Sequence, residues 1–224
     1  MAVLVAAASV VEVQAPDFNG ITILKKTENI MKRSSLIIIG AVAALLAIYC
    51  VSTYNSLAKA SQEVAGAWSN VETQYQRRSD LIPNLVNTVK GYAAHESQTL
   101  ESVVAARAAA TSITVDGANM SAEQMAAYVE AQGNVTSALG RLIAVAENYP
   151  DLKANQNFLE LQSQLEGTEN RIAVERQRYN DIVKSFNKRV VTFPTNIIAG
   201  IFGFDAKEFF AAQAEAATAP VVQF

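Results

Sequence analysis

Histidine and cysteine, two side chains that often take part in catalysis and in metal binding, are scarce in this sequence. It contains one histidine, His95, and one cysteine, Cys50, so a zinc site would need carboxylates for its remaining ligands. His95 precedes Glu96, but the second histidine of a zinc-protease motif is absent, as is the Glu-x-x-His motif of di-iron bundles. Glu166 and Glu169 have the spacing of ordinary neighbours on a helix surface. We therefore expect no metal site and no catalytic carboxylate pair.

The sequence also lacks the short motifs of common enzyme classes. It has no Walker A loop, G-x-G-x-x-G, G-x-S-x-G or C-x-x-C. It contains 18 basic and 21 acidic residues, so it has no net positive charge that would attract a phosphate backbone. We expect a protein that is not an enzyme and binds neither a cofactor nor nucleic acid.

Charged residues that interrupt the apolar helical patterns are more informative. We expect a hydrogen-bonded ion network, or alternatively a recognition groove, built from Trp68, Glu72, Arg77, Arg78, Asp80, Glu169 and Arg176. Removing one partner of a buried ion pair costs about 3–5 kcal/mol. Such a network can therefore fix the register of packed helices without doing chemistry.

The elements that position these residues are predicted to be helices. Half of the residues are hydrophobic, whereas only 10 are Gly and 5 are Pro, which favours long helices over a many-stranded sheet. We expect an all-α fold.

One segment is apolar enough to cross a membrane. No charge occurs from Ser34 to Ala58, and a charge-free helix of this length spans a hydrocarbon core of about 30 Å. A secretory signal peptide is the alternative. However, the apolar region of a signal peptide is usually shorter, and no clean small-x-small cleavage site follows the apolar run in this sequence. We therefore expect a single transmembrane helix over residues 31–53.

Charge predicts the orientation of this helix. Lys25, Lys26, Lys32 and Arg33 precede it, whereas only Lys59 lies in the twenty residues after it. The positive-inside rule then leaves the N-terminus in the cytoplasm and the rest of the chain in the periplasm, attached to a bacterial inner membrane. Residues 1–30 differ in composition from the rest of the chain, and we expect a disordered extension or a mispredicted start there.

Residues 54–192 are predicted to form an antiparallel four-helix bundle, because apolar residues recur at alternating spacings of three and four. Pro83 predicts a turn or sharp kink between the first and second helices. Gly117 marks a loop, and Ser121 with Gln124 forms a capping box for the third helix. Pro150 marks the next corner, and Pro194 ends the fourth helix. The helical seams of this coiled-coil type contain Leu57, Val64, Trp68, Val71 and Tyr75; Leu85, Val89, Tyr92 and Val103; Met125, Tyr128, Val135, Leu139, Leu142 and Tyr149; and Leu152, Leu159, Leu165, Ile172, Tyr179, Val183, Phe186 and Val190.

Residues 193–224 are predicted to be an apolar segment followed, after Lys207, by a flexible tail. The apolar stretch is too short to span a membrane, so it packs on the end of the bundle, lies in the lipid interface or contacts another copy. The candidate membrane-contacting residues are Ile197, Ile198, Ile201, Phe202 and Phe204.

Several motifs together resemble the LemA family. They are residues 54–57 (YNSL), 67–72 (AWSNVE), 75–78 (YQRR), 80–92 (DLIPNLVNTVKGY), 165–172 (LEGTENRI), 178–180 (RYN), 193–194 (FP) and 202–204 (FGF). The resemblance runs from about residue 31 to residue 204. It implies one N-terminal transmembrane helix followed by an antiparallel four-helix bundle, and it supplies no catalytic residues.

Two functions are compatible with these expectations. The first is a membrane-anchored helical scaffold, homo-oligomeric, that presents a surface to protein or lipid partners. The second is an accessory factor for a membrane quality-control protease or an envelope transport system. Its recognition surface would lie around Trp68, Arg77, Arg78 and Asp80.

Overall fold

The structure is a computed structural model that describes residues 18–117 and 119–210, with side chains described at Met31 and from Arg33 onward. All regular elements in these residues are helices, which confirms the all-α fold class. The chain divides into two compact units, Met1–Val51 and Ser52–Phe224. We call the second the helical unit.

The first unit contributes the apolar part of α1 (Phe18–Tyr92). Of the described helices, α1 is the one long and apolar enough to cross a membrane. Its large apolar side chains are open to the surroundings, with Leu36 68% and Ile48 67% exposed. The hydroxyls of Ser34 and Ser35 donate to the Met31 carbonyl, so these polar groups are satisfied within the helix. This segment has the composition and exposure that a membrane anchor requires.

The prediction that the first and second helices separate at Pro83 was wrong, because α1 continues through Pro83 to Tyr92. Proline cannot donate the backbone hydrogen bond that would reach the carbonyl four residues earlier, which belongs to Ser79. That carbonyl instead accepts a hydrogen bond of 2.9 Å from Nε of Arg107 on α2 (Ser97–Ser112). A neighbouring helix thus replaces the missing bond, and the chain reverses only after Tyr92.

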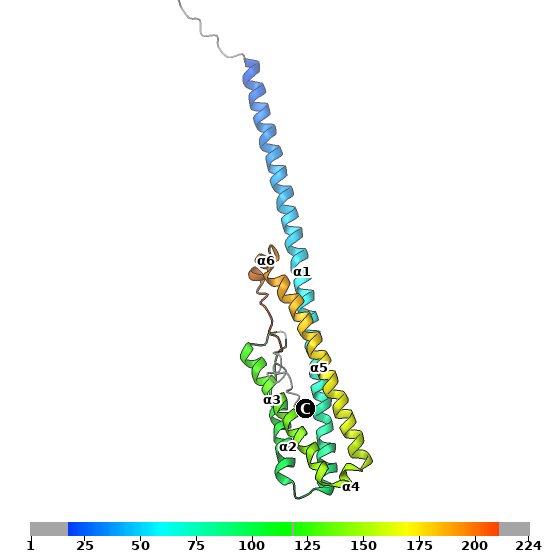
Figure 1. Ribbon diagram of the computed structural model, residues 1–224. Helices are drawn as coiled ribbons and strands as arrows, with labels where there is room; N and C mark the ends of the chain where they lie inside the picture. Colours follow the sequence, from blue (N-terminus) through cyan, green and yellow to red (C-terminus); the bar gives the residue numbers. More distant parts are fainter. Residues whose placement is uncertain (1–17, 118, 211–224) are drawn as a thin grey trace, which may run out of the picture. The chain divides into compact units, whose positions relative to one another are not determined.

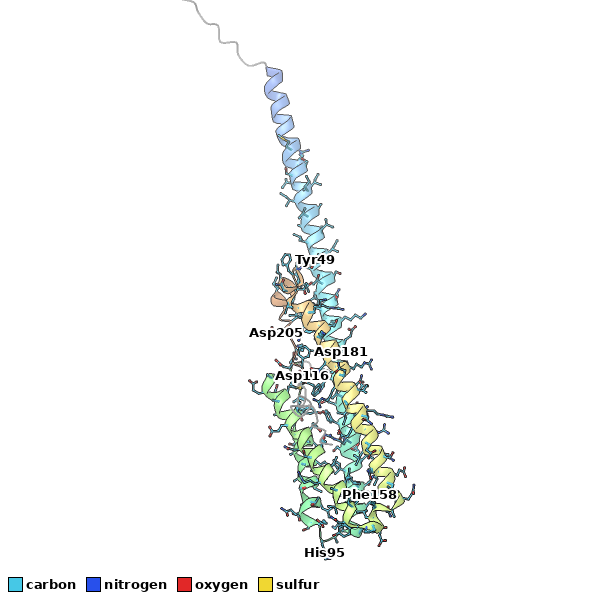
Figure 2. The ribbon with its side chains drawn as sticks, in the orientation of Figure 1. Tyr49, His95, Asp116, Phe158, Asp181 and Asp205 are labelled. Carbon is cyan, nitrogen blue, oxygen red and sulfur yellow. The ribbon has the colours of Figure 1, made fainter. Side chains whose placement is uncertain are left out.

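The reversal divides the predicted second helix between two elements. Leu85, Val89 and Tyr92 lie on α1, whereas Val103 lies on α2. His95 lies in the turn between these helices and is exposed (Figure 2).

The remaining helices begin and end near the predicted signals. The predicted capping box opens α3 (Ala122–Val145), with Gln124 N donating to Ser121 Oγ at 3.2 Å and Ser121 N donating to Gln124 Oε1 at 2.9 Å. The corner at Pro150 contains the short helices η1 (Ala146–Asn148) and α4 (Pro150–Lys153). Helix α5 (Gln156–Val191) is capped by Asn155, and α6 (Thr195–Phe202) ends at Gly203, whose φ of 72° favours glycine.

Within the helical unit, α1, α2, α3 and α5 lie beside one another (Figure 1). Two hydrophobic clusters join them. One contains Leu85, Val103, Leu142 and Leu165, one from each helix. The other contains Val64, Trp68, Tyr128 and Tyr179, together with Phe210 near the end of the described chain. All five seam residues predicted on the first helix are buried, whereas Tyr92 and Leu159 are each 44% exposed.

Candidate functional site

Arg78 lies at the centre of a buried polar network. This residue belongs to α1, and its side chain is only 2% exposed. Nη1 donates to Thr136 Oγ1 and to Glu169 Oε1, both at 2.8 Å. Nη2 donates to Gln132 Oε1 at 2.6 Å and to the Gln132 carbonyl at 3.2 Å. These bonds compensate the buried cation and join α1 to α3 and α5.

The structure brings together only some of the predicted network residues. Arg78 and Glu169 form an ion pair at 2.8 Å. Trp68 is buried in an aromatic cluster instead, and the guanidinium of Arg176 lies 4.8 Å from the centre of the Phe210 ring.

The other three predicted residues lie apart from Arg78. Arg77 and Asp80 are exposed, and Asp80 accepts a hydrogen bond from Gln76 at 2.7 Å. Glu72 is half-buried and lines a polar pocket.

Sequence reasoning missed the α3 partners of Arg78. Gln132 lies four residues after Tyr128 and three before Val135, so a polar residue at this apolar seam was a readable signal. Thr136 lies outside the seam and gave no such signal.

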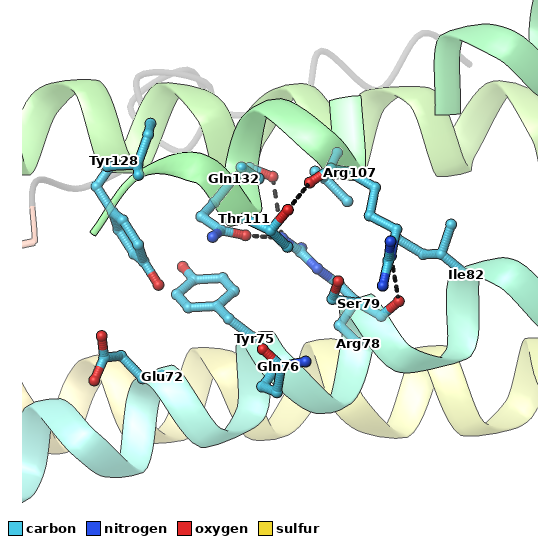
Figure 3. A pocket seen from close by; sticks show the side chains of 13 residues that line it. Glu72, Tyr75, Gln76, Arg78, Ser79, Ile82, Arg107, Thr111, Tyr128 and Gln132 are labelled. Carbon is cyan, nitrogen blue, oxygen red and sulfur yellow. Dashed lines mark hydrogen bonds between the residues drawn. The ribbon is translucent and has the colours of Figure 1, made fainter. Parts of the chain in front are cut away.

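The polar pocket opens beside this network, between α1, α2 and α3 (Figure 3). Its volume is about 130 Å³. Its polar lining residues are Glu72, Tyr75, Gln76, Arg78, Ser79, Arg107, Thr111, Tyr128 and Gln132. The pocket thus gathers both signs of charge and several hydroxyl groups in one place.

The two tyrosines of the pocket are kept neutral. Their rings meet edge to face, with centroids 5.5 Å apart. Burial raises the pKa of Tyr75, although the charges of Arg176 and Arg78 oppose the effect. Burial also raises the pKa of Tyr128, and Tyr75 and Glu72 add to that shift. Both hydroxyls can therefore donate hydrogen bonds at any physiological pH.

An aromatic cluster surrounds Trp68 on α1. Its ring stacks on Phe210 with centroids 5.5 Å apart and an interplanar angle of 9°, and it also contacts Tyr128 and Tyr179. A Cβ atom at Gly117 would lie 2.1 Å from the indole. The loop before α3 can therefore cover Trp68 only with glycine at this position.

Residues 203–210 follow α5 in reverse, and we call them the strap. Asn187 accepts from Lys207 N at 2.7 Å and donates to the Lys207 carbonyl at 2.8 Å. Asn180 makes the same pair of bonds to Phe210, at 2.9 and 3.0 Å. The two asparagines are seven residues apart on α5, and the strap residues that they hold are three residues apart. The spacings match because seven residues of helix and three residues of extended chain both span about 10 Å. The predicted flexible tail lies, from residue 211, outside the described residues.

Helix α6 exposes part of the predicted membrane-contacting set. Ile197 is 52%, Ile201 69% and Phe202 53% exposed, whereas Ile198 is buried. Phe204 is half-buried, and both phenylalanine rings pack against Tyr54 of α1, with centroids 4.8 and 5.7 Å away.

Residues able to hold a metal do not gather in the described parts of the chain. No group of three or more His, Cys, Asp or Glu side chains lies together in residues 18–117 and 119–210 as far as their side chains are described. The features on which a function can be argued are therefore the apolar helix, the pocket, the strap and α6.

These features define a class of all-helical proteins with one helix suited to a membrane. The chain belongs to the LemA family, whose sequence model matches residues 67–224.

Curated relatives extend the similarity along most of the chain. Magnetosome protein MamQ 2 of Paramagnetospirillum magneticum is 29% identical over 198 residues, which cover 81% of this chain and 71% of the relative. Protein LemA of Metamycoplasma hominis is 29% identical over 149 residues, or 66% of this chain and 64% of the relative. Magnetosome protein MamQ of Magnetospirillum gryphiswaldense is 25% identical over 209 residues, or 84% and 77%. Together with the apolar helix, the family identifies a membrane-associated helical protein.

Proposed function

We propose that this protein is a non-enzymatic, membrane-anchored scaffold of the bacterial envelope that presents its helical unit to protein or lipid partners. The observation that carries the proposal is α1 itself. The same helix contains the exposed apolar segment and, after Ser52, the buried residues that form the core of the helical unit. In this proposal residues 31–53 are the anchor, and α1, α2, α3 and α5 form an antiparallel four-helix bundle over residues 54–192. Residues 18–30, which were expected to be disordered or untranslated, continue the anchor helix as the first part of α1.

Helix α6 supplies a second contact with lipid in this proposal. Ile197, Ile201 and Phe202 are exposed, and Phe202 packs on Tyr54, which follows the apolar segment of α1 by three residues. An exposed apolar helix that packs against a residue just after a membrane span is suited to the interface between lipid and water. Ile198 and Phe204 would instead hold α6 against the other helices of the helical unit.

Self-association is supported by small residues on α2. Ala105, Ala108 and Ala109 are exposed and follow the three- and four-residue spacing of one helix face. Alanine allows two helices to approach closely. We therefore propose a homo-oligomer with α2 at its interface.

An adaptor function for a membrane protease or transport system is the second candidate. The observation that favours it is the exposure of Arg77 and Asp80 on α1, one turn apart, where a partner could reach both charges. Trp68 and Arg78 would support this surface from the core, because both are buried.

Crosslinking in intact cells tests the scaffold. A photoreactive residue in place of Ala109 is expected to give a crosslinked dimer of this chain, whereas the same residue in place of Ser163, exposed on α5, is expected to give none. A monomeric mass in mild detergent together with no crosslink from Ala109 would contradict self-association. Crosslinks from Arg77 to a protease or transporter subunit would favour the adaptor function instead.

A further inference from the structure

The pocket between α1, α2 and α3 carries two charged groups that form no ion pair with the residues that the structure describes. Arg107 uses Nε to bond the Ser79 carbonyl, and no carboxylate within the described residues pairs with its guanidinium. Glu72 forms no hydrogen bond or ion pair within the same residues. Arg78 differs from both, because Glu169 already compensates its charge.

The two free charges lie at opposite ends of the pocket. Glu72 lies beside Tyr75 and Tyr128, while Arg107 lies beside Ser79 (Figure 3). Glu72 and Ser79 are seven residues apart on α1, which corresponds to a rise of about 10 Å. A molecule that bridges the ends must therefore carry its own charges several ångströms apart.

A buried hydroxyl lies at the positive end of the pocket. Ser79 is 7% exposed, and its Oγ atom forms no hydrogen bond with any described part of the chain. A buried donor without an acceptor destabilises the folded protein. A ligand oxygen at this position would accept the hydrogen bond of the Ser79 hydroxyl and remove that cost. The neighbouring Arg78 is held by four hydrogen bonds and cannot turn toward Ser79 without breaking them.

The size of the pocket limits the ligand. Its volume of about 130 Å³ is close to that of an apolar cavity of about 150 Å³ that holds benzene in another protein. A molecule of about six to eight non-hydrogen atoms therefore fits.

We infer that this pocket binds a small zwitterion, with a carboxylate that accepts from Arg107 and Ser79 Oγ and an ammonium group that donates to Glu72. The hydroxyls of Tyr75 and Tyr128 lie on the same side of the pocket as Glu72 (Figure 3), where their oxygens can accept further hydrogen bonds from the ammonium group. The inference goes beyond the scaffold function and does not depend on it, since the pocket residues all belong to the helical unit.

Titration calorimetry on the full chain in detergent tests this site with three probes of similar size. γ-Aminobutyrate carries both charges, butyrate carries only the carboxylate, and n-butylamine carries only the ammonium group. We expect saturable binding of γ-aminobutyrate and binding at least about tenfold weaker for the other two, since each loses a charged hydrogen bond. Equal binding of butyrate, or no saturable binding of γ-aminobutyrate, would overturn the inference.

Two variants separate the ends of the ligand. Glu72→Gln is expected to weaken γ-aminobutyrate binding about tenfold and to leave butyrate unaffected. The matched control Glu63→Gln changes an exposed carboxylate on the same helix and is expected to change neither. Ser79→Ala removes the unpartnered hydroxyl, so it is expected to weaken binding while the thermal midpoint of the ligand-free protein stays the same or rises. If both pocket variants bind γ-aminobutyrate as the parent chain does, the site is wrong.

Discussion

Arg78 shows how one residue can determine the pairing of three helices. Its hydrogen bonds reach Gln132 and Thr136 on α3 and Glu169 on α5. Sliding α3 along α1 would break three hydrogen bonds of Arg78, and sliding α5 would break its ion pair with Glu169. The network therefore specifies register, a task that apolar contacts alone do poorly because they are not directional.

Replacing this cation by an apolar side chain should be costly. Arg78→Met leaves the Gln132 amide and the Glu169 carboxylate without their donor, and we expect a loss of about 2 kcal/mol in the free energy of unfolding. The value lies below that of a fully buried pair because Glu169 is 37% exposed and water can solvate it. Chemical denaturation of the full chain in detergent measures the loss. Arg77→Met, at the exposed neighbour, should change stability by less than about 0.5 kcal/mol, and equal effects of both variants would contradict the account.

Tyr179 gives the helical unit a dependence on alkaline pH. Burial raises its pKa from 10.0 to about 12, and the hydroxyl donates to the Glu208 carbonyl at 3.2 Å. The unfolded chain therefore loses this proton at lower pH than the folded one, so the stabilisation is complete below pH 10 and decreases between pH 10 and 12. Tyr179→Phe should make the free energy of unfolding fall less steeply in this window. An unchanged slope in the variant would show that Tyr179 does not titrate as the structure implies.

At the scale of elements, Arg107 on α2 compensates for Pro83 on α1, because it donates to the Ser79 carbonyl that Pro83 leaves without a donor. The sequence pattern of neither helix reveals this relation. If Arg107 replaces the hydrogen bond that Pro83 cannot make, the two residues must be energetically coupled. Arg107→Met should destabilise the parent chain by about 1 kcal/mol but cost much less in a Pro83→Ala background, where the new N–H can reach Ser79 O. A double-mutant cycle by denaturation measures the coupling. Arg141→Met, exposed on α3, is the control, and additive effects of the first pair would contradict the explanation.

The strap is a second element held by specific side chains. Asn187→Ala removes both bonds to Lys207, so we expect faster cleavage by trypsin after Lys207 with little change in helix content. Asn170→Ala, exposed on the same helix, should leave the cleavage rate unchanged. Mass spectrometry of the fragments over time compares the two variants, and equal rates would show that Asn187 does not hold the strap.

The sequence predicted these elements where the signal was local. Apolar spacing identified the helical seam of Trp68, and the capping box at Ser121 identified the start of α3. Pro83 misled because its compensation comes from Arg107, 24 positions further along the chain on another helix. The strap escaped prediction for a related reason, since Asn180 and Asn187 resemble ordinary polar residues of an exposed helix face until the chain returns beside them. The Arg78–Glu169 pair was predictable as two charges in apolar helical patterns. Its partner Gln132 could have been recognised as a polar residue in the seam of α3, whereas Thr136 lies outside that seam and could not.

At the scale of the whole molecule, we propose that one helix anchors this protein in a membrane and leaves the helical unit in the periplasm. Four basic residues precede the apolar segment, namely Lys25, Lys26, Lys32 and Arg33, and Lys59 alone lies in the twenty residues after it. The helical unit would then meet its partners on the outer side of the inner membrane.

The most direct test is protease accessibility of the full chain, followed with a C-terminal tag. The tag should be protected in intact cells, lost when the outer membrane is permeabilised, and protected again in inverted inner-membrane vesicles. Loss of the tag in inverted vesicles, with protection in permeabilised cells, would contradict the periplasmic assignment and direct the search for partners to the cytoplasm.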